Sequence, residues 1–172
     1  MHLVMNKDIL KYIYDKVTKS SRATTFGNPP QVDENFFTEL SREIGSGRYQ
    51  CSPSKRIYLK KTNGGVRPLG IPSLRDKIVQ EAIKMVIEPV FEKKFLKHSH
   101  GFRPRKGTKT ALREIRKTFT STKWFIKLDI AKGFDTLDHK LIIHFVDQEI
   151  SDPLLHQTLH KFLKAGYIYR DD

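Results

Sequence analysis

The chain has 172 residues and a mass of 20.0 kDa, which fits one domain or part of a larger one. Hydrophobic residues make up 38%, enough for a core, and no apolar run approaches the roughly 20 residues needed to cross a bilayer, so we expect neither a wholly disordered chain nor a membrane partner. Charged residues interrupt the start of the chain, unlike a secretory signal, and the lone Cys51 excludes an internal disulfide and a cysteine-based metal site.

The positive charge of the chain is concentrated in one segment. The net charge is +13, and residues 91–127 hold 12 basic residues but only two acids, Glu92 and Glu114. Aromatic residues lie between these charges, and a basic stretch of this kind favours a polyanionic partner such as nucleic acid. A solvated helix face is the alternative interpretation.

The first two predicted elements are helices. Apolar residues at helical spacing predict a helix over residues 7–19, and the polar residues 20–30 after it are typical of a loop. Asp33 is placed to cap a second helix that ends at residues 45–47.

A hairpin and a third helix follow. Residues 55–60 and 66–71 are predicted strands, and the Asn-Gly pair within residues 62–65 supplies the positive φ angles of a tight turn. Ser73 then opens a helix, with Asp76 at its third position.

The central part is predicted to contain a helix and a buried strand. Pro89 lies inside the apolar pattern of the helix that begins at Ser73, so a kink or break is expected there. Residues 108–119 read as another helix. Residues 124–130 are a mostly apolar run flanked by polar residues, which predicts a buried strand.

Two helices complete the predicted organisation, which is α+β. Asp135 and Asp138 fit the cap and third position of a helix that runs to about Ile150. Residue 151 or 152 caps a last helix, which Gly166 ends.

Asp129 is the main candidate for chemistry, because it ends the predicted apolar strand. An ionised carboxylate there is costly unless it is paired or bound to metal, and Mg²⁺ takes carboxylate and carbonyl oxygens, which Asp129 and the Ile130 backbone could supply. A strand-end aspartate that caps a turn is the other interpretation. His156 and His160 have helical i, i+4 spacing but lack the Glu of a zinc protease motif, so we interpret them as surface histidines.

The segment Phe-Ile-Lys-Leu-Asp-Ile-Ala-Lys-Gly-Phe-Asp-Thr-Leu-Asp-His at residues 125–139 resembles the first catalytic-aspartate motif of reverse transcriptases. Four further blocks resemble group II intron reverse transcriptases, or maturases, in the same order: residues 65–72, 75–81, 98–104 and 162–168. The resemblance covers roughly residues 36–168, and the amino-acid sequences of these blocks are most similar to those of mitochondrial-type intron proteins.

The resemblance implies a right-hand polymerase fold. Residues 1–35 would be an N-terminal helix and linker, 36–120 the fingers, and 121–172 a partial palm truncated before the second catalytic motif. The implied function is RNA-directed DNA polymerase activity by two-metal nucleotidyl transfer for intron mobility, together with assistance to intron splicing. The implied cofactor is Mg²⁺, and the implied partners are intron RNA, an RNA template, a DNA primer and dNTPs. A mitochondrial, organelle-encoded protein is the first expectation for localisation, and the bacterial cytoplasm the second.

The resemblance also implies site residues. Asp129 matches the metal-binding aspartate of the motif. The backbone of Ile130, the next residue, is implied to contact both the metal and the nucleotide. Phe134 matches the aromatic residue under the incoming sugar. Lys61 and Arg67 match basic fingers positions that hold the triphosphate.

Five basic residues are expected to contact the RNA backbone: Arg103, Arg105, Lys106, Lys109 and Arg113. Contacts of this kind position nucleic acid rather than specify its sequence.

The chain ends in Tyr169-Arg170-Asp171-Asp172, which matches the Tyr-x-Asp-Asp pattern of the family's second carboxylate motif. We interpret this match as a coincidence, because it follows Asp129 too soon and comes directly after a segment that precedes a different turn in the family. Two-metal chemistry needs carboxylates from both strands, so the chain is expected to be inactive alone.

Two other functions remain open. One is a non-catalytic RNA-binding splicing factor or truncated remnant, which the basic stretch would serve equally well. The other is a different reverse transcriptase lineage, such as a retron or a diversity-generating element.

Overall fold

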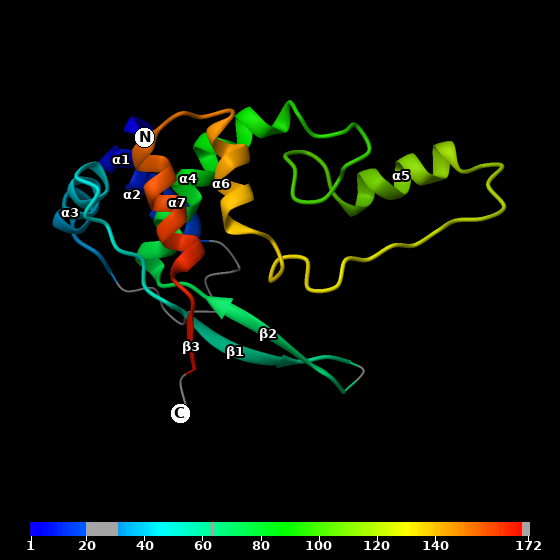
Figure 1. Ribbon diagram of the computed structural model, residues 1–172, viewed down its shortest axis with the longest axis horizontal. Helices are drawn as coiled ribbons and strands as arrows, with labels where there is room; N and C mark the ends of the chain where they lie inside the picture. Colours follow the sequence, from blue (N-terminus) through cyan, green and yellow to red (C-terminus); the bar gives the residue numbers. More distant parts are fainter. Residues whose placement is uncertain (20–30, 63, 170–172) are drawn as a thin grey trace. The chain divides into compact units, whose positions relative to one another are not determined.

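The computed structural model describes residues 1–19, 31–62 and 64–169 (Figure 1). The chain forms two compact units. The first comprises Met1–Val86 and Asp138–Asp172, and the second comprises Ile87–Leu137. Among the described residues, no helix has the length and apolar character needed to cross a membrane.

Helices make up most of the first unit. They are α1 (His2–Met5), α2 (Lys7–Lys19), α3 (Glu34–Gly45), α4 (Leu74–Glu92), α6 (His139–Asp147) and α7 (Pro153–Lys164). The predicted helix over residues 7–19 is confirmed as α2, which Asn6 caps by accepting hydrogen bonds from the backbone N–H groups of Asp8 and Ile9 at 2.9 and 3.3 Å. The predicted loop over residues 20–30 lies outside the described residues.

Aspartate caps fix where three of these helices begin. Asp33 accepts a hydrogen bond from the backbone of Phe36 at 2.9 Å, and Asp152 accepts one from Leu155 at 3.0 Å, as the sequence predicts. For α6 the predicted cap is wrong. Asp138 caps this helix, and Asp135 lies earlier, in a turn where its backbone N–H donates to the carbonyl of Lys132 at 2.9 Å.

The hairpin is confirmed as β1 (Ser54–Lys60) and β2 (Val66–Ile71), which are antiparallel. The N–H of Lys61 donates to the carbonyl of Gly65 at 2.7 Å, and Gly64 has a φ of +81°, as the predicted turn requires. Asn63 lies outside the described residues. A third strand, β3 (Tyr167–Tyr169), runs parallel to β1 and lies beside it in Figure 1, so the sheet order is β2-β1-β3.

The core lies in the first unit. Leu10 and Ile13 of α2, Leu40 of α3, Ile78 of α4 and Leu155 of α7 are all fully or almost fully buried. The rings of Tyr14 and Phe37 meet edge to face with centroids 5.7 Å apart, which joins α2 to α3. Lys161 of α7 donates to two carbonyl oxygens of the loop after α3 at 2.7 and 2.8 Å.

The second unit contains α5 (Thr108–Thr118), and none of its hydrophobic residues is buried. Helix α4 runs from the first unit into the second and continues past Pro89 to Glu92. Of the kink or break expected at this proline, the break does not occur, and the kink stays a prediction.

The predicted buried strand over residues 124–130 is wrong. The segment is extended but unpaired, and Trp124 is 89% exposed. A strand is stable only when a neighbouring strand satisfies its backbone groups, and the three strands of the described chain pair only with one another. The apolar side chains of this segment therefore stay exposed.

Candidate nucleotide and nucleic-acid site

Asp129 lies on the extended segment and is exposed. Its carboxylate makes no hydrogen bond to any described residue, which leaves its oxygens available as ligands for a hard cation such as Mg²⁺. Within the described part of the chain, no cluster of three or more His, Cys, Asp or Glu side chains could hold a metal. Asp129 therefore fits as one metal ligand, whereas a two-metal site needs further carboxylates.

Phe134 and Ile130 accompany Asp129 in the second unit, and both side chains are exposed. Lys132 has a φ of +52°, and its carbonyl accepts hydrogen bonds from the N–H groups of Asp135 and Thr136 at 2.9 and 3.1 Å. Phe134 lies within this turn, and its side chain is 88% exposed.

Lys61 and Arg67 lie in the first unit, on the hairpin. Arg67 sits on β2 opposite Leu59, and Lys61 follows the last residue of β1. Both side chains are exposed, so the hairpin presents two cationic groups to solvent near its turn.

Three of the predicted RNA-binding residues come together at the start of α5. Arg105, Lys106 and Lys109 line a hollow of about 430 Å³ with the backbone around Gly107. The free N–H groups and the positive end of a helix dipole favour anions at such a place, and the three cations add to this preference. Arg113 is exposed further along α5.

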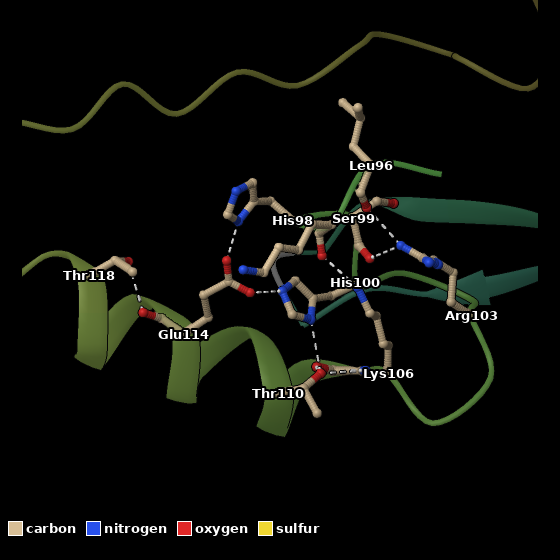
Figure 2. A network of polar contacts seen from close by, with 11 residues as sticks. Leu96, His98, Ser99, His100, Arg103, Lys106, Thr110, Glu114 and Thr118 are labelled. Atoms are coloured by element: carbon tan, nitrogen blue, oxygen red, sulfur yellow. Dashed lines mark hydrogen bonds and ion pairs between the residues drawn. The ribbon is translucent and has the colours of Figure 1, made fainter. Parts of the chain in front are cut away.

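Two of the five residues already use their cationic groups within the protein (Figure 2). Nζ of Lys106 donates to the carbonyl of Lys97 at 2.5 Å, and the guanidinium of Arg103 is engaged by several partners. Its Nε and Nη2 donate to the Glu92 carboxylate, with the shortest distance 2.8 Å. Its Nη1 donates to the carbonyl oxygens of Leu96 and Ser99 at 2.7 and 2.9 Å, as Figure 2 shows. A weaker contact of Nη2 with the Glu92 carbonyl, at 3.5 Å, occupies the fifth N–H. These contacts give Arg103 a structural role in the connection between α4 and α5, and the RNA contact expected for it stays a prediction.

The pKa values of this pair reflect the contact. Hydrogen bonds from Arg103 lower the pKa of the Glu92 carboxyl, and the bond to Glu92 raises that of the Arg103 guanidinium. The neighbours Phe102 and Arg105 have φ angles of +55° and +59°, which non-glycine residues rarely adopt. Arg103 thus stabilises the connection between α4 and α5 in a backbone conformation that Phe102 and Arg105 disfavour.

Glu114 holds the same connection from α5 (Figure 2). Its carboxylate pairs with Nδ1 of His98 and with Nε2 of His100, the latter at 2.8 Å. These bonds, the one from His98 first, lower the pKa of Glu114. Nδ1 of His100 lies 2.9 Å from the hydroxyl of Thr110, which also bonds the backbone of Gly107.

The sequence contained a signal for both structural contacts. Glu92 and Glu114 are the only acids in residues 91–127. Each is a half-buried partner of a residue in the connection between α4 and α5. Isolated acids in a basic segment are therefore informative, because such a carboxylate has a structural partner close by.

Comparison with protein families gives a match over most of the chain. The family described as "Reverse transcriptase (RNA-dependent DNA polymerase)" matches residues 59–170, which include Lys61, Arg67, Asp129 and Phe134.

Several intron-encoded proteins are similar to this chain. The COX1/OXI3 intron 1 protein of Saccharomyces cerevisiae is 36% identical over 172 residues, covering 98% of this chain and 21% of the relative. Group II intron-encoded protein LtrA of Lactococcus lactis subsp. cremoris is 35% identical over 170 residues, covering 96% of this chain and 28% of the relative. Nuclear intron maturase 1, mitochondrial, of Arabidopsis thaliana is 35% identical over 112 residues, covering 61% of this chain and 16% of the relative. The chain therefore spans less than a third of the length of these relatives.

Proposed function

The chain belongs to the reverse transcriptase (RNA-dependent DNA polymerase) family, and on this premise we propose that it forms the fingers and early palm of a group II intron-encoded reverse transcriptase and maturase. In this proposal residues 1–35 are an N-terminal helix and linker, 36–120 the fingers, and 121–172 the partial palm. The observation that carries the proposal is the family match over residues 59–170, in which Asp129 is an exposed carboxylate with no hydrogen-bond partner among the described residues.

The proposed reaction is nucleotidyl transfer from a dNTP to a DNA primer on an RNA template. Asp129 and the backbone carbonyl of Ile130 would hold Mg²⁺, with carboxylates from outside this chain completing the site. When bound, the metal ions supply Lewis-acid activation of the primer hydroxyl and of the leaving group. Lys61 and Arg67 bind the triphosphate, since Arg can grip phosphate oxygens with two donors, and Phe134 lies under the sugar.

Binding of intron RNA is assigned to the start of α5. Arg105, Lys106 and Lys109 share one hollow at the start of α5, and Arg113 adds an exposed cation further along that helix. These residues contact phosphates and so orient the intron RNA during splicing and reverse transcription.

The names of the relatives support two locations. One relative is a mitochondrial maturase and another a bacterial intron-encoded protein. We propose a mitochondrial, organelle-encoded protein first and a bacterial cytoplasmic one second.

The test is primer extension on an RNA template by the complete protein that contains this chain, with Asp129→Ala as the variant. We expect Asp129→Ala to abolish synthesis and to leave RNA binding and thermal stability unchanged, because the exposed Asp129 side chain makes no hydrogen bond to a described residue. Glu39→Ala removes an exposed carboxylate from α3 and is the matched control for charge. Undiminished synthesis by Asp129→Ala, or no synthesis by the unmodified protein, would favour the non-catalytic RNA-binding splicing factor.

A further inference from the structure

Three tyrosines share one exposed face of the sheet. Side chains alternate along a strand, so Arg56 and Tyr58 of β1 point to the same side. The parallel register places Tyr167 beside Ser54 and Tyr169 beside Arg56, on that side. Tyr58, Tyr167 and Tyr169 are 52%, 46% and 56% exposed.

The three rings and the arginine are held in a fixed arrangement. The rings of Tyr58 and Tyr169 are within 10° of parallel, and the Tyr58 hydroxyl donates to that of Tyr169 at 3.2 Å. Tyr167 meets Tyr169 edge-on with centroids 5.3 Å apart, and the guanidinium carbon of Arg56 lies 3.3 Å from the centre of the Tyr167 ring. The hydrogen bond raises the pKa of Tyr58 and lowers that of Tyr169.

The exposed rings and the positive charge of this face suit a ligand that carries planar rings on a negatively charged backbone. Exposed, ordered aromatic rings offer stacking surfaces to any base. Residues 51–72 hold five basic residues and no acid, so the hairpin repels cations and attracts polyanions.

We propose that Tyr58, Tyr167 and Tyr169, with Arg56, form a stacking platform for unpaired bases of single-stranded RNA. The charge of the hairpin selects a polyanion, and the rings select one that carries planar bases, which distinguishes RNA from an acidic peptide. The choice of RNA rests on the proposed function, whereas the platform itself rests on the geometry of the sheet.

The test compares two probes with the 172-residue chain. One probe is a short oligouridylate, and the other is an abasic ribose-phosphate strand of the same length and charge. We expect Tyr58→Leu and Tyr169→Leu each to weaken oligouridylate binding by roughly fivefold to a hundredfold while binding of the abasic strand stays unchanged. Tyr58→Phe keeps the ring and should bind oligouridylate nearly as well as the unmodified chain.

Two controls keep the result interpretable. Tyr12→Leu removes a similarly exposed tyrosine from α2, away from the sheet, and should leave binding unchanged. Photo-crosslinking of the unmodified chain to 5-iodouridine in the oligouridylate should map to Tyr58, Tyr167 or Tyr169, and this result does not depend on the folding of a variant.

Equal loss of both probes in the leucine variants, or crosslinks only elsewhere, would overturn the platform while leaving RNA binding intact. Failure of the unmodified chain to bind either strand would instead overturn the proposed RNA-binding function.

Discussion

The hydroxyl of Tyr49 donates a hydrogen bond to the carboxylate of Asp76, which joins the loop after α3 to the first turn of α4. Asp76 is 1% exposed, and it also accepts hydrogen bonds from the Ser52 backbone at 3.1 Å and the Ser73 hydroxyl at 2.7 Å. Burial and this hydrogen bond raise the pKa of Tyr49 far above its ordinary value, so the phenol stays a donor at every practical pH. The carboxylate is tolerated in the core because its oxygens have partners.

Tyr49→Phe should therefore destabilise the first unit. The substitution keeps the ring, which packs 5.9 Å from that of Phe162, and removes one hydrogen bond to a buried charge. A bond of this kind contributes about 1.5–3 kcal/mol, so urea denaturation should show a loss of that order. Tyr12→Phe removes an exposed hydroxyl and is the control. Equal stabilities for the two variants would show that Asp76 finds another donor.

Local signals in the sequence were sufficient to predict most of this unit. The amphipathic pattern of α2, the caps Asp33 and Asp152 and the Asn-Gly hairpin each depend on residues within a few positions of one another. Asp76 was predicted at the third position of α4, but its burial was not, because its partner Tyr49 comes from another element.

Long-range pairing explains what could not be predicted. The pairing of β3 with β1 joins residues more than a hundred positions apart, and no local pattern records it. The apolar run at residues 124–130 has the composition of a buried strand, yet composition does not supply the neighbouring strand that burial needs. Arg103 is a different case, because its charge suggested RNA, and the isolated acid Glu92 was the sequence signal for the contact that the structure adds.

The cap of α6 gives a second stability prediction. Asp138 accepts a hydrogen bond from the Lys140 backbone at 2.7 Å, whereas the Asp135 side chain makes no hydrogen bond to a described residue. Asp138→Ala should lower the free energy of unfolding by about 0.5–2 kcal/mol, and Asp135→Ala by less than about 0.5 kcal/mol. Chemical denaturation of both variants measures the difference. A larger effect at Asp135 would restore the cap predicted from the sequence.

Glu114 should titrate below its ordinary pKa of 4.5, because hydrogen bonds from His98 and His100 favour its ionised form. A carboxyl whose pKa is lowered by folding adds stability above its unfolded pKa, and this stability is lost as the pH falls through the folded value. The hydrogen bonds that join Glu114 of α5 to His98 and His100 should therefore hold at neutral pH. They should weaken only as the pH falls through the lowered pKa of Glu114. Carbon NMR of the Glu114 carboxyl measures the titration directly.

The histidines provide the control for this titration. In a variant with both His98→Gln and His100→Gln, the Glu114 pKa should rise toward its ordinary value. An unchanged low pKa in that variant would assign the shift to the surrounding lysines and arginines instead.

RNA binding should depend strongly on salt, and the dependence should locate the phosphate contacts. Each cation that neutralises a phosphate releases counterions, so the logarithm of affinity falls linearly with the logarithm of salt concentration, by about 0.7 per contact for a single strand. Lys109 lines the hollow at the start of α5 and its side chain is exposed. Lys109→Gln should therefore reduce the slope by about 0.7.

Lys7→Gln on α2 is the matched control for this change, since Lys7 is an exposed lysine outside the basic segment. It removes the same net charge but no proposed contact, so the slope should stay constant. Equal reductions in both variants would mean that the RNA responds to the overall charge of +13 rather than to the hollow. A flat salt response of the unmodified chain would contradict phosphate binding by the basic segment altogether.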